Sequence, residues 1–248
     1  SFSNPDLGAF ESELGTFEDI TNYSVSTLGS NSGTGFFDDP LLTIQSAIAL
    51  ASDGDTVSVS NGVYYENLDL NGKSLTLIGE SREQTIINGG NSGPVILIND
   101  PVSGVVKIKG FDISGGMGLM GGEPNAPDIS VGGGIFALYN NVHLEDLKIT
   151  GNTAHTGGGA YIYSSDASQE DLIMKNVIFD GNTAIDDAGS SALVYQASDQ
   201  NLEIRNCNFD GNQSSNPNQG RITASIFGGN FSLVMDSTDF ISNTGQLE

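Results

Sequence analysis

The stretch Leu172-Ile173-Met174-Lys175-Asn176-Val177-Ile178-Phe179 decides the fold, because its apolar spacing recurs along the chain. The first, third, sixth and eighth residues are apolar, which predicts two short alternating strands joined by a one-residue corner. The same four positions return as Val106/Ile108/Phe111/Ile113, Val142/Leu144/Leu147/Ile149, Leu202/Ile204/Cys207/Phe209 and Leu233/Met235/Thr238/Phe240. The eighth position therefore advances in steps of 36, 30, 30 and 31 residues. A fixed period of this length predicts stacked coils that share one continuous core.

The composition bounds the classes of function. The 31 acidic and 8 basic residues give a net charge of -23, which argues against nucleic acid as a partner because phosphate binding needs a basic surface. The same charge disfavours anionic membranes, and it disfavours polyuronates unless Ca²⁺ bridges the charges. No apolar run is long enough to span a membrane, so we expect no membrane insertion. The acidic surface suits a secreted or cell-surface protein, and the alternative is that it serves solubility alone. The oligomeric state is left open.

Two regions are expected along the chain. Residues 1–36 lack periodicity and are predicted to be an irregular N-terminal segment or linker, followed by a β-helix domain over 37–248. Within that domain, an apolar stripe at helical spacing predicts a helix over 40–51, with Asp39 as its N-cap. A helix with one apolar side suits the exposed end of a stacked sheet, so it is expected to cap the coil.

A family resemblance supports this architecture. The stretches Leu42-Thr43-Ile44-Gln45-Ser46-Ala47-Ile48, Asp53-Gly54-Asp55-Thr56-Val57 and Leu75-Thr76-Leu77-Ile78-Gly79 resemble the opening of the pectin-lyase-like superfamily. The resemblance implies an all-β, right-handed parallel β-helix from about residue 40 onward. It is nearly silent on activity, because this fold carries lyases, hydrolases, esterases and adhesins. The N-terminal phrase 4–11 resembles one that closes such domains, so the chain is expected to be a fragment of a longer protein.

Two columns of repeated polar residues are predicted to be structural. The asparagines that follow the second strand, at 152, 182, 212 and 243, are expected to hydrogen-bond to their copies in neighbouring coils. Charged residues recur at one outward slot, so opposite charges are expected to neighbour each other as aids to register: Lys109, Glu145, Lys175, Arg205 and Asp236. The single cysteine, Cys207, falls on an inward slot and is expected to be a buried apolar residue.

The predicted ligand-binding surface is an aromatic strip. A second strand series follows the glycine corners, and its outward residues are expected to stack into a continuous strip that includes Phe136, Tyr161, Tyr163, Tyr195 and Phe227. Aromatic faces can stack on the apolar sides of sugar rings, so a polysaccharide or cell-surface glycan is the expected partner. The alternative is that the glycine-rich loop 114–131, or residues 1–36, folds over the strip and covers it.

Catalysis and metal binding are secondary expectations. Cleavage of a glycosidic bond needs two carboxylates, and Asp186 and Asp187 form an adjacent pair near the strip. Asp180 and Asp210 recur one coil apart and are hard oxygen ligands suited to Ca²⁺, whereas two separated His and one inward Cys disfavour zinc. The sequence thus favours a non-catalytic extracellular module acting as a stalk, adhesin or glycan-binding surface. The alternatives are a polysaccharide hydrolase or lyase of the same fold and a spacer without a ligand.

Overall fold

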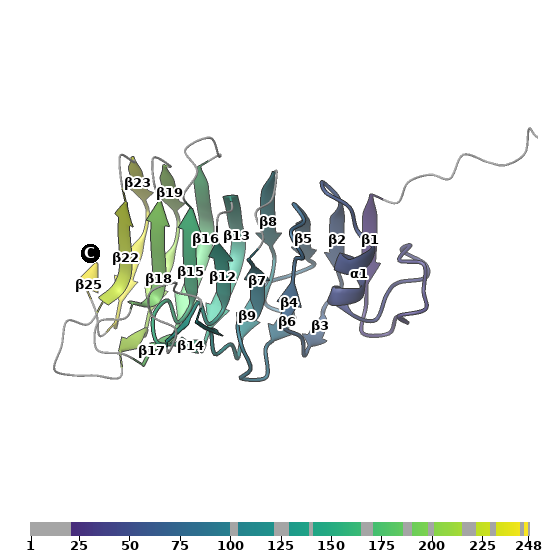
Figure 1. Ribbon diagram of the computed structural model, residues 1–248, viewed down its shortest axis with the longest axis horizontal. Coiled ribbons are helices and arrows are strands. Elements are labelled where there is room, and N and C mark those ends of the chain that lie inside the picture. The colour runs from purple at the N-terminus through teal and green to yellow at the C-terminus, as the bar shows by residue number, and fades with distance from the viewer. Residues whose placement is uncertain are drawn as a thin grey trace, which may run out of the picture.

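The computed structural model describes residues 21–99, 104–121, 129–138, 141–164, 171–185, 190–197, 201–214, 222–228, 232–243 and 246–247. Its strands stack along one axis as successive coils, with the N-terminal coils at one end and the C-terminal coils at the other (Figure 1). Among the described residues, the strand pairs are parallel except for one short antiparallel pair, β10 (Leu119–Met120) with β11 (Ser130–Val131). The fold is the predicted all-β, right-handed parallel β-helix. Connections between parallel strands in one sheet are right-handed in nearly all proteins.

The largest sheet, called here the long sheet, has 13 strands. Eight of them stack along its main path: β1 (Asn22–Val25), β2 (Thr56–Val59), β5 (Thr76–Gly79), β8 (Val105–Lys109), β13 (Asn141–Thr150), β16 (Leu172–Asp180), β19 (Leu202–Arg205) and β23 (Leu233–Asp236). Five more continue the same coils past a corner: β3 (Gly62–Tyr64), β6 (Thr85–Asn88), β9 (Asp112–Ser114), β20 (Asn208–Asp210) and β24 (Asp239–Ile241). Each predicted repeat thus contributes one rung to the stack.

Two smaller parallel sheets complete the coils. The second sheet has seven strands: β4 (Leu68–Asp69), β7 (Ile96–Ile98), β12 (Ile135–Leu138), β15 (Ala160–Ser164), β18 (Ser190–Ala197), β22 (Ile222–Gly228) and β25 (Gln246–Leu247). The third has three: β14 (Thr153–Ala154), β17 (Thr183–Ala184) and β21 (Gln213–Ser214). No described helix is both long and apolar enough to cross a membrane.

The one-residue corner of each repeat is confirmed and has a simple backbone cause. The corner residues have positive φ angles: 78° at Gly110, 50° at Asp146, 55° at Asn176, 52° at Asn206 and 49° at Ser237. Glycine, Asn and Asp tolerate this left-handed conformation better than other residues do. The corner therefore repeats at the same point of each coil and separates the two strands of the repeated phrase.

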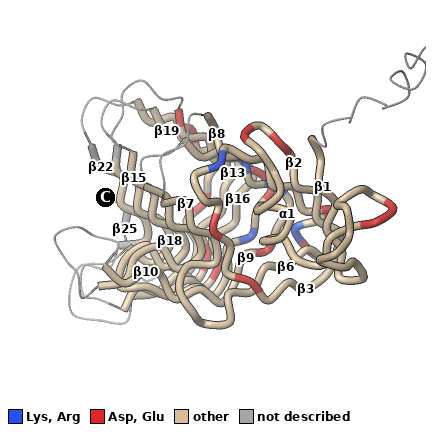
Figure 2. The backbone as a smooth tube through the Cα atoms, turned by 45° about the vertical axis from the view of Figure 1, so that its right-hand side comes forward, with Lys and Arg blue, Asp and Glu red and all other residues tan. Residues whose placement is uncertain are grey.

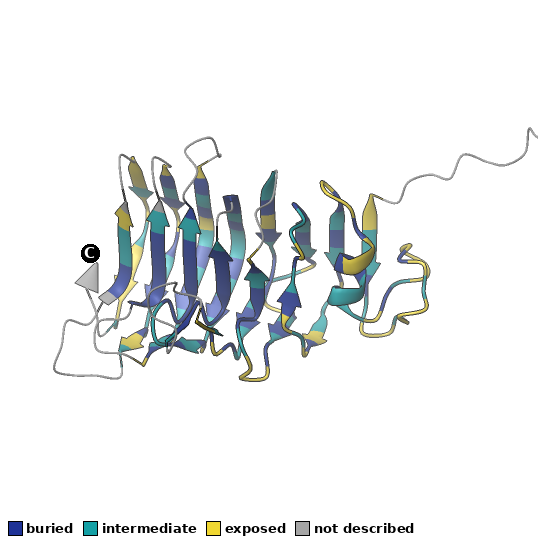
Figure 3. Ribbon diagram, in the orientation of Figure 1, coloured by how far each residue is buried: buried dark blue, intermediate teal, exposed yellow. Residues whose placement is uncertain are grey.

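Inward side chains form continuous apolar rows, which are the dark blue bands of Figure 3. Phe179 and Phe209 are fully buried, with parallel rings 4.9 Å apart, and Phe209 stacks on Phe240 at 4.6 Å. Cys207 is buried as predicted, with 2% of its surface exposed. Each fully buried Phe, Leu or Ile side chain contributes roughly 1.5–3 kcal/mol by removing apolar surface from water.

The predicted asparagine ladder is confirmed. Asn152, Asn182 and Asn212 have no exposed surface. The Oδ1 atom of Asn182 accepts from both the backbone N–H and the Nδ2 of Asn152 at 3.1 Å. The Oδ1 atoms of Asn212 and Asn243 repeat these contacts at 2.9–3.0 Å. Each amide in this row thus satisfies the polar groups of its neighbour inside an apolar core.

The N-terminal helix is shorter than the sequence predicts. Helix α1 spans Ile44–Leu50, and Thr43 is its N-cap. The buried face of the helix, Ile44, Ala47 and Ile48, packs into the core. Its first free N–H groups, at Ile44 and Gln45, each donate to the Glu66 carboxylate at 2.9 Å. Leu41 instead forms a strand-like bridge to Val25. The helix lies beside β1 and β2 at the N-terminal end of the stack (Figure 1) and covers the open core there.

The segment before the helix also differs from expectation. The sequence predicts an irregular region over 1–36, of which residues 1–20 lie outside the described part. Within the remainder, β1 pairs in parallel with β2, from Asn22–Thr56 to Val25–Val59. These residues therefore add a rung to the long sheet rather than serving only as a linker.

Candidate functional site

The aromatic strip of the second sheet is arranged differently from the prediction. Tyr195 lies opposite Ile162 and points into the core with no exposed surface. The column of Phe136 and Tyr161 continues to Val194 instead. One extra residue in β18, at the irregularity between Ser190 and Leu193, shifts the register and exchanges the two faces of the strand.

The outward members of the strip are covered. Phe136 is fully buried and Tyr161 is 3% exposed, and their rings stack at 5.9 Å. Val131 and the partly buried Leu119 and Ile129, all from the predicted covering loop, pack against them. Tyr163 is partly buried, and Phe227 is the one predicted contact residue that is exposed, at 46%. The glycine-rich loop therefore covers the strip, as the alternative prediction has it. The strip forms a hydrophobic cluster of its own, apart from the main core.

The predicted catalytic and calcium residues are not gathered into a site. Asp186 and Asp187 lie outside the described residues. Asp180 and Asp210 are neighbours on β16 and β20, and Asp180 pairs with the Lys148 ammonium at 3.8 Å. Among the described residues, no group of three or more His, Cys, Asp or Glu side chains is placed to hold a metal. Calcium binding by these two aspartates stays a prediction.

A hollow of about 350 Å³ lies on the outer face of the long sheet. We call it the lysine groove, because three of the residues that line it are Lys107, Lys109 and Lys175. They stand on β8 and β16, on either side of β13, which contributes His143 and Glu145. Ile78 and Ile173 supply apolar walls. With His143 neutral, three lysines and one glutamate give the lining a charge of +2, in a chain whose net charge is -23.

The cations of the lysine groove belong to a longer row. Five of the eight basic residues of the chain point outward from the long sheet: Lys107, Lys109, Lys148, Lys175 and Arg205. In the register of the strands, Glu145 lies between Lys109 and Lys175, and Lys175 lies opposite Arg205. Figure 2 shows blue positions near β8, β13 and β16 on a tube whose turns carry red ones. Carboxylates accompany most of these cations, because Lys109, Lys148, Lys175 and Arg205 each make at least one ion pair.

The predicted charge column is confirmed, and each cation in it is ion-paired, whereas Lys107, outside the column, has no ion pair within the described part of the chain. The Glu145 carboxylate lies 3.7 Å from the Lys109 ammonium and 3.8 Å from that of Lys175. Lys109 also pairs with Asp146 at 3.4 Å. Lys107 makes no ion pair with any residue that the structure describes. His143 contacts the carbonyl oxygen of Asp171 through Nε2 at 3.2 Å, which fixes the orientation of its ring.

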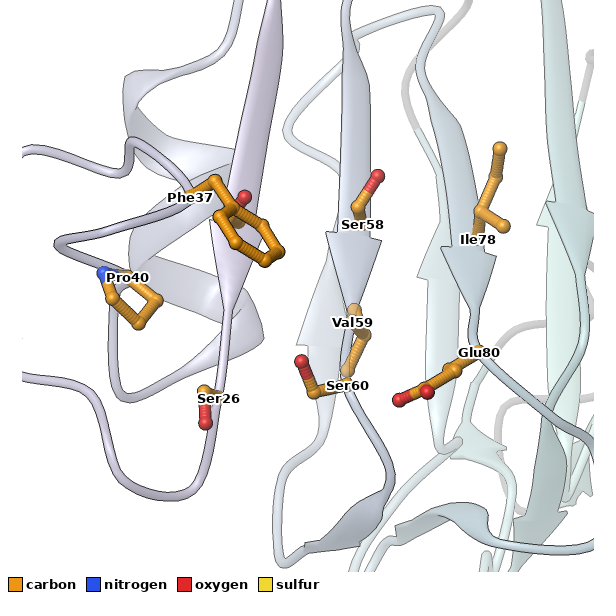
Figure 4. Close-up of a pocket in the computed structure, with 9 residues that line it drawn as sticks. Ser26, Phe37, Pro40, Ser58, Val59, Ser60, Ile78 and Glu80 are labelled. Carbon is orange, nitrogen blue, oxygen red and sulfur yellow. The ribbon is translucent and has the colours of Figure 1, made fainter.

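A second hollow, of about 550 Å³, lies on the same face at the N-terminal end of the stack (Figure 4). We call it the serine hollow, because its lining includes Ser24, Ser26, Ser58 and Ser60, together with Phe37, Pro40, Val59, Ile78 and Glu80. Ile78 lines both this hollow and the lysine groove. The two hollows therefore follow one another along the outer face of the long sheet.

One carboxylate on this sheet has altered electrostatics. Partial burial raises the pKa of Asp112 above its usual value, while the Thr150 hydroxyl, which donates at 2.6 Å, and the nearby Lys148 oppose the shift. Desolvation disfavours the charged form of a carboxyl group, so the folded state holds its proton more tightly. Asp112 lies next to Lys148 on the adjoining rung and outside both hollows.

The sequence signal for the lysine groove was present but incomplete. The outward column through Lys109 is visible in the repeat, and it predicts paired charges rather than a site. Lys107 lies two residues earlier on the same face, but neither spacing nor residue type predicts a hollow there. The serine hollow depends on β1, which lies in the segment 1–36 that the sequence predicts to be irregular, and on Phe37 directly after that segment. No repeat marks either feature.

Comparison with known proteins gives a likeness of fold. No protein-family model and no curated protein matches the chain. Pectin methylesterase PemA from Erwinia chrysanthemi is 16% identical, over 83% of this chain and 66% of that one, with a TM-score of 0.45. A mutant pectin methylesterase in complex with a hexasaccharide is 16% identical, over 89% and 66%, with a TM-score of 0.45. A pectin methylesterase in another hexasaccharide complex is 12% identical, over 91% and 92%, with a TM-score of 0.38.

These similarities concern the fold alone. The chain spans slightly less than two thirds of the length of the first two proteins. The register of the parallel strands establishes the parallel stack independently of these likenesses. Because one fold carries many activities, function must be argued from the sites of this chain.

Proposed function

We propose that this chain is an extracellular β-helix module that binds an acidic polysaccharide along the lysine groove. The observation that carries the proposal is the charge of that groove, which is +2 from its lining residues and +1 with the Asp146 carboxylate that pairs with Lys109, in a protein of net charge -23. Negative charge elsewhere disfavours nonspecific binding of anions. An anionic ligand would therefore bind where the three lysines stand close together.

The arrangement of the groove suits an extended ligand. Lys107 and Lys109 stand on one strand and Lys175 on the strand beyond β13, so carboxylates spaced along a chain can meet successive ammonium groups. The Ile78 and Ile173 side chains offer apolar surface to the flat sides of sugar rings. Lysine binds an oxyanion as a point charge without a fixed geometry, which suits carboxylates in several orientations. This revises the expectation that the overall charge disfavours polyuronates.

The test is a binding titration with hexagalacturonate in 20 mM buffer at low salt. We expect Lys107→Ala/Lys175→Ala to weaken binding at least tenfold, because the two cations contribute to the same electrostatic site. Lys107 and Lys175 are exposed, so their removal leaves the core intact. The matched control is Lys73→Ala, since the Lys73 ammonium binds carbonyl oxygens at the end of α1, away from the groove.

Two results would contradict the proposal. Absence of hexagalacturonate binding at millimolar concentration would remove it. Equal weakening by the groove variant and by Lys73→Ala would show a nonspecific effect of charge. Salt screens exposed charges, so 0.3 M NaCl is expected to lower the affinity whether binding is specific to the groove or a nonspecific effect of charge. Salt dependence therefore serves only as a secondary check.

The alternative function, a polysaccharide hydrolase or lyase, is tested by turnover. The pair Asp186 and Asp187 keeps its predicted role as acid and base, and the assay monitors reducing ends together with the ultraviolet absorbance of unsaturated products. Hydrolysis that is lost in Asp187→Asn would establish the enzyme. Binding without turnover across a panel of acidic and neutral polysaccharides would support the non-catalytic module.

A further inference from the structure

We infer that the serine hollow is a subsite for a neutral sugar, separate in chemistry from the anion-binding lysine groove. The Phe37 side chain is 91% exposed and stands at the edge of the hollow, projecting from the loop beside β1 (Figure 4). An aromatic ring held almost entirely in water beside a hollow of about 550 Å³ has a large unpartnered apolar face. Such a face can pack against the C–H groups of one side of a pyranose ring.

The charge of the hollow selects against an anion. Its lining residues include one carboxylate, Glu80, and no Lys, Arg or His. A uronate or sulfate bound here would face Glu80 without a compensating cation, whereas a neutral sugar has no such penalty. The two hollows therefore differ in the sign of the charge that each presents to a ligand.

The polar groups of the hollow match the hydroxyls of a sugar. The Ser24 and Ser60 hydroxyls make no side-chain hydrogen bond with another described residue, so both can donate and accept. One Glu80 oxygen, Oε2, accepts from the Asn61 N–H at 3.0 Å, which anchors the side chain. The second oxygen remains to accept from a hydroxyl group, and a carboxylate acceptor gives a strong hydrogen bond. Apolar walls with a few placed polar groups are typical of small-molecule sites.

The position of the hollow fits a glycan rather than a single sugar. Because Ile78 lines both hollows, a chain bound across the serine hollow can run on along the same sheet toward the lysine groove. The occupant we infer is a neutral segment of an oligosaccharide, with a ring against Phe37. The inference stands on the residues of the serine hollow and does not require that the lysine groove bind an anion.

The experiment is isothermal titration of the intact chain with three neutral hexasaccharides, cellohexaose, mannohexaose and β-1,4-galactohexaose, and with hexagalacturonate. We expect at least one neutral hexasaccharide to bind, with its Kd raised at least tenfold by Phe37→Ala and several-fold by Glu80→Gln. Tyr65→Ala is the matched control, because Tyr65 is also an exposed aromatic residue, at 78%, and does not line the hollow. It should change the Kd less than twofold.

The two proposals fail separately. Lys107→Ala/Lys175→Ala should leave neutral hexasaccharide binding within twofold of the unmodified chain, while it weakens hexagalacturonate binding at least tenfold. If none of the three neutral hexasaccharides binds at millimolar concentration, or if Phe37→Ala binds as tightly as the unmodified chain, the inference is overturned. If neutral sugars bind and hexagalacturonate does not, the subsite stands and the function proposed for the lysine groove falls.

Discussion

At the scale of single residues, the asparagine ladder gives the sharpest prediction of stability. In Asn182→Ala, the backbone N–H and Nδ2 of Asn152 lose their shared acceptor inside the core. Each orphaned buried donor costs about 1–3 kcal/mol, so we expect a loss of about 2–6 kcal/mol in urea unfolding. Asn243→Ala is the control and should cost less, because Asn243 ends the described ladder and is only partly buried. Equal losses would mean that the ladder does not depend on burial.

Asp112 gives a prediction of pH dependence. Burial raises the pKa of Asp112 in the folded state, so that state binds more protons than the unfolded chain just above the usual carboxyl pKa. Stability from this group is therefore lost as pH rises through that window. We expect Asp112→Asn, which can still accept from the Thr150 hydroxyl, to gain thermal stability relative to the unmodified chain between pH 3 and pH 7. A difference in melting temperature that stays constant with pH would refute the shift.

At the scale of elements, the seven-residue helix depends on an acceptor from another coil. Both oxygens of Glu66 accept from N–H groups at the start of α1, at 2.9 Å each. Because a free helix N-terminus costs about 0.5–2 kcal/mol, Glu66→Ala should lower the free energy of unfolding by about that amount. Glu83→Ala, at an exposed ion pair with Arg82, should cost at most about 1 kcal/mol. A Glu66 effect no larger than the Glu83 effect would contradict this role.

Elements also show where prediction from sequence ends. The repeated phrase predicts the long sheet correctly, because inward and outward residues alternate with a fixed period and the corner recurs. The aromatic strip fails at β18, where one inserted residue reverses the facing of Tyr195. Alternation alone cannot locate a bulge, since each register buries apolar residues on one face or the other. Coverage of Phe136 by the loop that carries Leu119 is a contact distant in sequence, which residue spacing does not encode.

At the scale of the whole molecule, the architecture was predictable and the candidate sites were only partly so. Inward rows such as Phe179 and Phe209 specify stacking, because each coil must bury the row of its neighbour. A hollow depends instead on the sizes and orientations of the outward side chains that surround it, as around Lys107. Its position follows from the assembled surface rather than from any repeat, and Phe37 reaches the serine hollow only because β1 joins the sheet.

The net charge of -23 gives a prediction for the entire chain. Mutual repulsion of acidic residues destabilises a compact state, and salt screens it with a Debye length of about 10 Å at 0.1 M. The exposed ion pairs of the long sheet, such as Lys109 with Glu145, contribute roughly 0–1 kcal/mol each. The stability lost when salt screens these pairs is therefore smaller than the stability gained when salt screens the repulsion between acidic residues. We therefore expect the melting temperature to rise between 20 mM and 300 mM NaCl, while hexagalacturonate binding weakens. A melting temperature that falls with NaCl would show that local ion pairs outweigh the net charge.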